Sequence, residues 1–361
     1  MDMKYMFLQL FAQAGDVVNA TTQYVNAYTG TPAPFAGKNT LEGELKTFYD
    51  TELLENARVE MVYAQFAKKQ PLPANHGGTV EWRKFNTFAR ADKLTEGVIP
   101  TGQKMGMSTI TASIDQYGTY ATISDKLDLR AYDPVLLIAS EEMGASAAET
   151  QEVLIRDGLL TNTNVLYCDN VAADGTFKST PTTPATMGAS EADGYALLTP
   201  DMVAKAATKM KKDRVPTIGG KYVAVIHPSV AYDLRKSKEW MDVHKYAAVT
   251  EIFNGEIGEL HGVRFVENTF APILGGTTYQ NKAGGVTYAT YFFGKDAYAI
   301  IDPAGGALQM IAHDKDEIGG PLNQFSTVGY KFETNGASVL YTERVLRVMS
   351  VSSYSATDEV N

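Results

Sequence analysis

The sequence predicts an α+β fold, because one long helix is surrounded by segments with the composition of β-strands. Residues 133–160 (DPVLLIASEEMGASAAETQEVLIRDGLL) form a continuous helical pattern. Stretches rich in β-branched and aromatic residues precede it at 79–88 and 108–124, as expected for strands. Between residues 199 and 301 predicted strands and helices alternate, which indicates a smaller α/β unit.

The long helix has clear start signals and two distinct sides. Asp133 is a suitable N-cap, and Pro134 fits the first helical position. The predicted inner stripe consists of Leu136, Ala139, Met143, Ala147, Thr150 and Leu154, and the opposite side carries Glu141, Glu142, Glu149, Glu152 and Arg156. The alanine-rich stripe indicates a sheet or another backbone packed closely against a helix roughly 40 Å long.

The first 78 residues divide into an arm and a helix. Residues 1–40 are rich in Gly, Ala, Thr, Asn and Pro with little periodicity, so we expect an arm that is ordered by contacts outside its own domain. Residues 41–69 show apolar side chains at three- and four-residue steps, and Pro71 and Pro73 end this predicted helix. No stretch of the sequence approaches the length of a membrane span.

The two strands at 79–88 and 108–124 enclose a long irregular loop. Residues 89–107 (ARADKLTEGVIPTGQKMGM) are mainly polar and contain three glycines and a proline. Structureless loops of this length are uncommon inside compact domains and usually serve a function. A two-stranded arm of this kind also needs a partner surface to be stable in water. We therefore expect contacts with a neighbouring subunit from Arg90, Asp92, Lys93, Glu96 and Lys104.

The second half of the chain begins after a Gly/Ser/Thr/Pro-rich loop at 170–193, the best internal boundary in the sequence. The predicted elements that follow are a helix from Thr199 to about 214, strands at 222–226, 263–267, 288–293 and 297–301, and a helix at 229–236. Residues 324–351 are predicted as two strands around 334–337, where Asn335-Gly336 is a turn signal.

Composition and motifs argue against catalysis and against nucleic-acid recognition. The formal net charge of −10 does not suit a protein that grips phosphates, and the single cysteine, Cys168, excludes an intrachain disulfide. The sequence has no phosphate-binding loop, no Gly-x-Ser-x-Gly and no His-x-x-x-His. The cluster at 313–317 (HDKDE) is interpreted as a solvated loop. We predict no catalytic residue, no cofactor and no metal site.

Several dispersed segments together resemble the major capsid proteins of tailed bacteriophages with the Hong Kong 97-type fold. The segments that carry the resemblance are 48–65 (FYDTELLENARVEMVYAQ), 94–97 (LTEG), 116–118 (QYG) with 124–125 (SD), 254–268 (NGEIGELHGVRFVEN) and 321–331 (PLNQFSTVGYK). They occur in the family's order over residues 41–350.

The resemblance implies a domain map for the whole chain. It assigns an N-terminal arm (1–40), an N-terminal helix of the peripheral domain (41–78), an extended loop (79–124), a peripheral domain with a long spine helix (125–197), an axial domain (198–315), and return strands of the peripheral domain with a C-terminal tail (316–361). The lysine–asparagine cross-link of some members does not carry over, because no acidic catalyst is identified between Lys93 or Lys104 and Asn335.

The implied function is that of a structural major capsid protein. It would self-assemble into pentamers and hexamers that form the icosahedral head around the double-stranded DNA of a tailed phage, without sequence-specific DNA binding and without a membrane. Portal, scaffolding and decoration proteins would be further partners. The protein would be assembled in the cytoplasm of the host bacterium and located in the virion.

Two alternatives remain open at the level of the sequence. The chain could be a soluble α+β enzyme whose long loop acts as a lid, or an encapsulin-like shell that holds a protein cargo. Size in solution distinguishes the enzyme from a shell, because a lid enzyme would be a small oligomer and a shell protein gives rings or particles.

Overall fold

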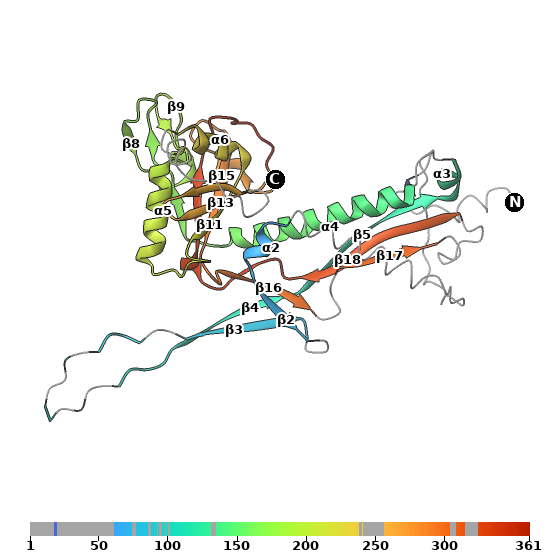
Figure 1. The fold of residues 1–361 in the computed structure, drawn as a ribbon, viewed down its shortest axis with the longest axis horizontal. Helices are drawn as coiled ribbons and strands as arrows, with labels where there is room; N and C mark the ends of the chain where they lie inside the picture. Colours follow the sequence, from blue (N-terminus) through green and yellow to red (C-terminus); the bar gives the residue numbers. More distant parts are fainter. Residues whose placement is uncertain are drawn as a thin grey trace, which may run out of the picture. The chain divides into compact units, whose positions relative to one another are not determined.

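The computed structural model describes residues 18–19, 61–73, 77–85, 88–91, 93, 96–97, 99, 102–130, 135–237, 240, 256–303, 308–314 and 324–361. The chain divides into two compact units (Figure 1). Unit 1 consists of Met1–Gln65, Asp115–Leu154 and Asp302–Thr334, and unit 2 consists of Phe66–Ile114, Ile155–Ile301 and Asn335–Asn361.

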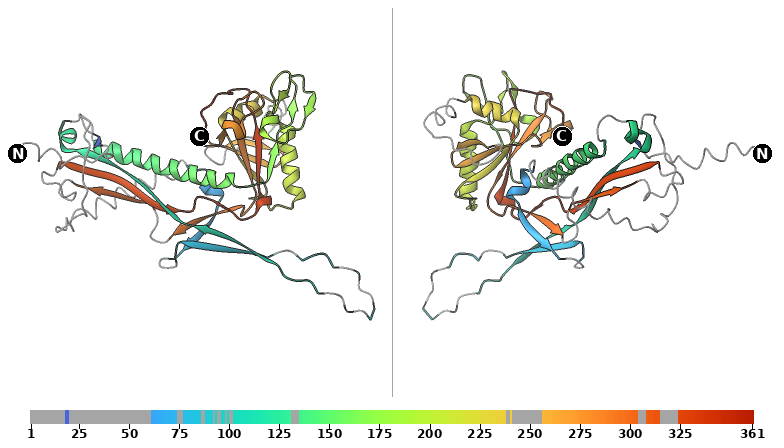
Figure 2. Two further views of the ribbon diagram at one scale, coloured as in Figure 1. Left: turned by 180° about the vertical axis from the view of Figure 1, so that it is seen from behind. Right: turned by 45° about the vertical axis from the view of Figure 1, so that its right-hand side comes forward.

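Unit 1 is a four-stranded sheet covered by a long helix. The strands have the order β1 (Val18–Asn19), β5 (Asp115–Ser124), β18 (Phe325–Thr334) and β17 (Gln309–His313). β5 and β18 are antiparallel along their full lengths, with Asp115 opposite Thr334 and Ser124 opposite Phe325. α3 (Asp125–Arg130) follows β5, and α4 (Val135–Leu160) runs alongside β5 and β18 in both views of Figure 2.

The predicted long helix and its inner stripe are confirmed within the described residues, which begin at Val135 and so exclude Asp133 and Pro134. Ala147 and Ala148 are buried against sheet residues that include Met310, Val328, Tyr330 and Phe332, and Leu136, Met143 and Leu154 pack against the same cluster. The Tyr330 hydroxyl lies 3.1 Å from Ser146 Oγ and 3.3 Å from Thr150 Oγ1, so the tyrosine is hydrogen-bonded at the edge of this core.

The prediction that Glu152 and Arg156 lie on the outer side of the helix is wrong. The exposed fractions of Glu152 and Arg156 are 1% and 4%. Each charged group is hydrogen-bonded to other groups of the protein, which offsets the cost of burying it. Glu152 Oε1 accepts hydrogen bonds from the backbone amides of Val62 (3.0 Å) and Tyr63 (3.1 Å) at the start of α2 (Tyr63–Phe66). Such amides at a helix N-terminus have no partner within the helix. Arg156 donates to the Asp157 carboxylate (2.9 Å).

Removal of the Glu152 carboxylate is expected to destabilise the subunit. Glu152→Ala leaves buried amide donors unpaired and should lower the free energy of unfolding by about 3 kcal/mol. Glu152→Gln keeps one acceptor oxygen and should lower the free energy of unfolding by less than Glu152→Ala does. Glu149→Ala, at an exposed position of the same helix, is the control and should change stability by less than about 0.5 kcal/mol. Urea denaturation followed by circular dichroism measures all three, and a Glu152→Ala value equal to the control would contradict this account.

Unit 2 contains a seven-stranded mixed sheet. The strand order is β12 (Glu256–Leu260), β13 (Val263–Glu267), β11 (Tyr222–Ile226), β15 (Thr287–Phe293), β20 (Val345–Ser350) and β6 (Val165–Tyr167), with β14 (Ile273–Leu274) paired to β15. The neighbours β11/β13 and β20/β6 are parallel, and the other neighbouring pairs are antiparallel. The strands predicted at 222–226, 263–267 and 288–293 are therefore confirmed.

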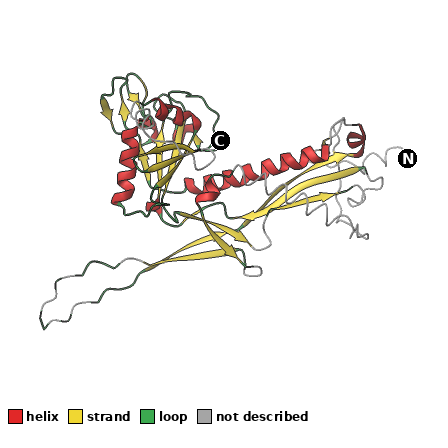
Figure 3. Cartoon of the chain, viewed as in Figure 1, coloured by secondary structure: helices red, strands yellow, loops and turns green. Residues whose placement is uncertain are grey.

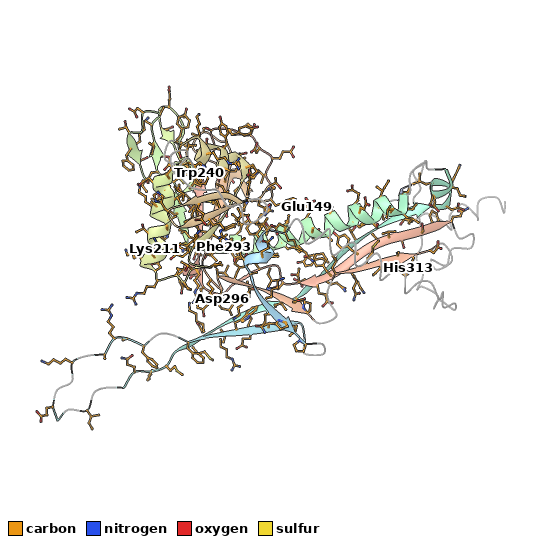
Figure 4. All side chains as sticks on the ribbon, in the orientation of Figure 1. Glu149, Lys211, Trp240, Phe293, Asp296 and His313 are labelled. Carbon is orange, nitrogen blue, oxygen red and sulfur yellow. The ribbon has the colours of Figure 1, made fainter. Side chains whose placement is uncertain are left out.

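Two helices share the core of this sheet, α5 (Pro200–Lys212) and α6 (Pro228–Lys236) (Figure 3). Thr199 is the N-cap of α5 as predicted, and its hydroxyl accepts from the Met202 amide (3.4 Å). Apolar side chains of both helices are buried with Tyr222, Phe265 and Phe292. Trp240, labelled in Figure 4, meets Phe265 edge to face at a ring distance of 5.9 Å.

The boundary loop predicted at 170–193 contains three short strands, which form a small sheet with a fourth strand that follows it. Its strand order is β8 (Phe177–Ser179), β7 (Asn170–Val171), β10 (Gly194–Tyr195) and β9 (Ala189–Ser190), with the 3-10 turn η1 (Pro184–Thr186) between β8 and β9. The buried Asn170 side chain donates to Ser179 Oγ and the Thr186 carbonyl and accepts from the Gly188 amide. Polar residues that read as a loop are thus the ones that join these short strands.

The two strands predicted over 324–351 are confirmed as β18 and β20, and the structure adds that they belong to different sheets. β18 pairs with β5 and β17, whereas β20 pairs with β15 and β6. The intervening Asn335 accepts from the Ile301 amide (2.8 Å) and donates to Ser338 Oγ (3.0 Å). The chain therefore turns at Asn335 to begin β19 (Ser338–Val339), which lies in a three-stranded sheet with β16 (Tyr298–Pro303) and β2 (Lys68–Leu72).

Two further predictions need correction. Residues 41–60 of the helix predicted over 41–69 lie outside the described residues. Of the remaining residues of this prediction, only Tyr63–Phe66 are helical, because the strand β2 (Lys68–Leu72) begins at Lys68. The strand predicted over 108–124 is two strands, β4 (Met107–Ser113) and β5, separated at Ile114. The Ile114 amide donates to the Gly78 carbonyl (2.9 Å), which closes the hairpin of β4 with β3 (Thr79–Phe85).

Candidate assembly surface

The most distinctive feature of unit 2 is the antiparallel hairpin of β3 and β4, drawn as a two-stranded ribbon in Figure 1. Its register runs from Thr79 opposite Ser113 to Phe85 opposite Met107. Because side chains alternate along a strand, one face carries Val80 and Trp82 opposite Ala112 and Ile110, and all four are at least partly buried. The other face is exposed.

The chain from Phe85 to Met107, which we call the tip, is bridged by the side-chain amide of Gln103. The Ala89 amide donates to Gln103 Oε1 (2.8 Å), and Gln103 Nε2 donates back to the Ala89 carbonyl (3.2 Å). This pair of hydrogen bonds imitates a backbone bridge and keeps the two sides of the tip aligned beyond the last strand pair.

Four of the five charged residues predicted to contact a neighbour are described, and all four are exposed: Arg90, Lys93, Glu96 and Lys104. Asp92 lies outside the described residues. The four do not form an ion pair with any residue in the described part of the chain.

The tip also exposes large apolar side chains that the sequence-based choice of site residues missed. The exposed fractions are 58% for Phe85, 60% for Phe88, 94% for Ile99, 63% for Met105 and 52% for Met107. The occurrence of several large apolar residues in and beside a mainly polar loop is the sequence feature that could have identified them. We call these five residues, together with Arg90, Lys93, Glu96 and Lys104, the loop surface.

A second exposed surface lies on α4 in unit 1. Ile138, Glu141, Glu142, Ala145 and Glu149 are exposed and follow one another at helical spacing, and we call them the α4 ridge. Glu149 is labelled on α4 in Figure 4. No lysine or arginine occurs between Val135 and Leu154, so the ridge is acidic with apolar residues between its carboxylates.

The described residues outside these surfaces show structural roles for groups that could carry chemistry. Burial raises the pKa of the Cys168 thiol, which keeps it protonated. His227 caps α6 by accepting from the Ser229 amide (3.2 Å), and burial lowers its pKa. No group of three potential metal ligands occurs among the described residues, and no described helix is long and apolar enough to cross a membrane. Of the 313–317 cluster, only His313 and Asp314 are described.

Comparison with known proteins identifies the family. A sequence model for phage capsid proteins matches residues 108–314, more than half of the chain. The chain belongs to the phage capsid protein family. A search of the curated proteins found no match to this capsid protein. The family match begins at Ser108 and so does not include the tip.

Solved phage capsids share the fold of this capsid protein. The capsid of cyanophage P-SCSP1u has a TM-score of 0.58 at 14% identity, covering 81% of this chain and 89% of that chain. The cyanophage Pam1 capsid has a TM-score of 0.58 at 14% identity, covering 83% and 94%. The capsid of Ralstonia phage GP4 has a TM-score of 0.57 at 13% identity, covering 82% and 92%.

The predicted fold class is therefore confirmed. The chain is a structural major capsid protein with the Hong Kong 97-type α+β fold, and it is a component of the virion.

Proposed function

We propose that this capsid protein assembles through pentamers and hexamers into the icosahedral head that encloses the double-stranded DNA of a tailed phage. Its role is structural, without catalysis or a cofactor. Assembly takes place in the cytoplasm of the host bacterium, with portal, scaffolding and decoration proteins as further partners. The β3–β4 hairpin with its tip corresponds to the extended loop of the domain map, α4 to the spine helix, and strands β11 to β15 of the seven-stranded sheet to the axial domain, whereas β6 and β20 of that sheet come from segments that the map gives to the peripheral domain.

The observation that carries this proposal is the exposure of five large apolar residues on the tip. Soluble monomers rarely leave so many large apolar side chains uncovered within one segment, and such exposure is typical of an interaction site. Burying these side chains against a partner would contribute on the order of 5 kcal/mol per loop. Every copy in a shell both gives and receives such a contact, so many modest interactions add up.

The α4 ridge of a second copy is the surface that suits the tip best. The described charges of the tip are mostly basic, at Arg90, Lys93 and Lys104, whereas the ridge presents Glu141, Glu142 and Glu149. Ile138 and Ala145 offer apolar contact between the carboxylates, as Phe88 and Met105 do between the basic groups of the tip. Complementary charge of this kind selects the partner and sets its register.

The proposed relation to DNA is enclosure without recognition. A net charge of −10 disfavours attraction to phosphates, since tight non-specific binding requires clustered basic residues. The exposed lysine of α5 nearest its start, Lys205, is already paired with Asp169 (2.5 Å) and Asp201 (2.9 Å).

The size of the purified protein in solution tests the proposed function. Sedimentation velocity over a range of protein and salt concentrations should show pentamers, hexamers or larger particles. A strict monomer under all conditions, including with a co-expressed scaffolding protein, would contradict the proposal. A small fixed oligomer would favour the enzyme with a lid.

A further inference from the structure

The base of the tip, at the far end of the paired strands β3 and β4, is connected to the rest of unit 2 by the Lys84 side chain. Lys84 is the next-to-last residue of β3, and its Nζ lies 3.2 Å from Glu343 Oε1 and 4.5 Å from the centre of the Tyr341 ring. Glu343 belongs to the 3-10 turn η2 (Thr342–Arg344), which leads directly into β20 of the seven-stranded sheet. Lys84 thus links the hairpin to that sheet.

The acceptor side of this link is itself fixed. The Arg344 guanidinium lies 3.7 Å from the centre of the Tyr341 ring, and Arg344 Nη1 donates to the Lys295 carbonyl (2.9 Å) between β15 and β16. Tyr341 therefore contacts two cations, one from the hairpin and one anchored to the sheet. We call Lys84, Tyr341, Glu343 and Arg344 the base clamp.

The surroundings of Glu343 favour its charged form. Burial alone would raise the pKa of Glu343, but hydrogen bonds from its own backbone amide and from Lys84 outweigh burial and hold the pKa below its ordinary value. The side chains of Lys84 and Glu343 are 33% and 41% exposed, so solvent screens the pair only in part. A cation against an aromatic ring is also stronger where water is partly excluded.

In the described part of the hairpin, Lys84 is the side chain that makes a polar contact with the rest of unit 2. Among the described hydrogen bonds, ion pairs and ring contacts of residues 79–113, only those of Lys84 reach a residue outside the hairpin. Arg83, its neighbour on the opposite face of β3, pairs with Glu81 within the same strand (3.4 Å).

We propose that the base clamp is the positioning device of the hairpin: Lys84, held by Glu343 and Tyr341, fixes the direction in which the tip projects from the seven-stranded sheet. Lys84 lies opposite Ser108, one pair before the last pair of the ribbon, so a change in its contacts tilts the end from which the tip projects and displaces the tip by a larger amount. The clamp determines whether the loop surface reaches a neighbouring copy in a productive orientation, and this last step rests on the proposed function.

Distance measurements on the full-length protein test the clamp without requiring assembly. Spin labels are placed at Lys104→Cys in the tip and Lys211→Cys at the end of α5, with the buried Cys168 unlabelled. The labelled protein without further substitutions, measured before assembly, should give one narrow distance distribution. Lys84→Glu and Glu343→Lys should each broaden or shift it, and the double variant should restore it. Arg83→Glu, the matched control, should leave it unchanged. Single variants that give the wild-type distribution would overturn the proposal.

The rate of particle formation by the same variants, without spin labels, is the second measurement. Each single variant should lower the rate of particle formation about fivefold, in line with one partly screened charge pair, and the double variant should recover it. Broadened distances with a normal assembly rate would overturn the positioning role. If the spin-label distances change as expected but the protein never assembles, the proposed function is refuted, whereas the positioning role of the clamp is supported.

Discussion

Replacement of residues 89–107 by a short Asn-Gly turn is expected to give a folded subunit that no longer forms particles. The described side chains of this segment are almost all exposed, so their removal uncovers little apolar core. In this variant residues 85–88 and the inserted Asn-Gly form a short connection between Lys84 and Ser108, which allows β3 and β4 to remain paired in the observed register. The variant keeps Phe85 and Phe88 but loses Ile99, Met105, Met107 and the basic groups of the tip, and with them most of the proposed contact to a second copy.

Two measurements separate folding from assembly in this variant. Circular dichroism and thermal melting should resemble the wild type, with a stability change of less than about 1 kcal/mol. Sedimentation under assembly conditions should show subunits alone. A full-length tip with Phe88, Ile99 and Met105 changed to Ser is the matched control for loop length, and it should also fail to assemble. Normal particles from the shortened variant would show that the tip is not the intersubunit contact, and failure to fold would place it in the core.

Reversal of the charge on the α4 ridge should abolish assembly as completely as removal of the tip. Glu141, Glu142 and Glu149 are exposed, so changing all three to Lys alters no buried contact. The variant would present basic groups to the Arg90, Lys93 and Lys104 of a neighbour. Like charges brought together across an interface cost several kcal/mol, on the order of what one tip contributes.

A compensating variant makes this prediction specific. Changing Arg90, Lys93 and Lys104 to Glu in the ridge variant restores opposite charges and should restore particles at low salt, as seen by light scattering. The control changes three exposed acidic residues of unit 2, Glu191, Asp213 and Glu359, to Lys, with the same change in net charge. If the control is as defective as the ridge variant, net charge rather than the ridge governs assembly, and the docking surface is wrong.

The elements that could be predicted from the sequence are those in which local signals and tertiary packing agree. α4 and α5 have periodic apolar stripes, and α5 also has a capped start at Thr199, while β11 is a short apolar run that lies in the middle of the seven-stranded sheet. The register of the hairpin also follows from alternation, since Trp82 and Ile110 face the same side.

The errors arise where distant partners decide the outcome. Glu152 is polar and therefore reads as exposed, but two backbone amides far away in sequence satisfy it inside the protein. A turn signal at Asn335-Gly336 follows β18, but β18 does not pair with β20. Instead, β18 forms ten residue pairs with β5, and a local turn cannot outweigh that pairing. A single residue, Ile114, separates β4 from β5, and no local composition marks that change of partner.

The residues expected to contact a neighbouring subunit were chosen from the sequence, and that contact stays a prediction. The charged residues of the tip stand out in a glycine-containing loop, and the four that are described are exposed. Phe88, Ile99 and Met105 carry no period, and apolar residues in a loop usually pack against their own domain, so only the structure shows that they are exposed. The α4 ridge was predicted as the polar side of the helix, but the sequence does not show that it forms an acidic, partly apolar surface suited to the tip.

The central claim, that this chain builds a closed shell with copies of itself, is tested most directly by electron microscopy of the purified full-length protein under assembly conditions, with a scaffolding protein supplied if required. We expect rings of five and six subunits and closed icosahedral particles, with the tip of each subunit lying on the α4 ridge of the next. A uniform population of small oligomers, in which each tip folds back over its own subunit, would contradict the account.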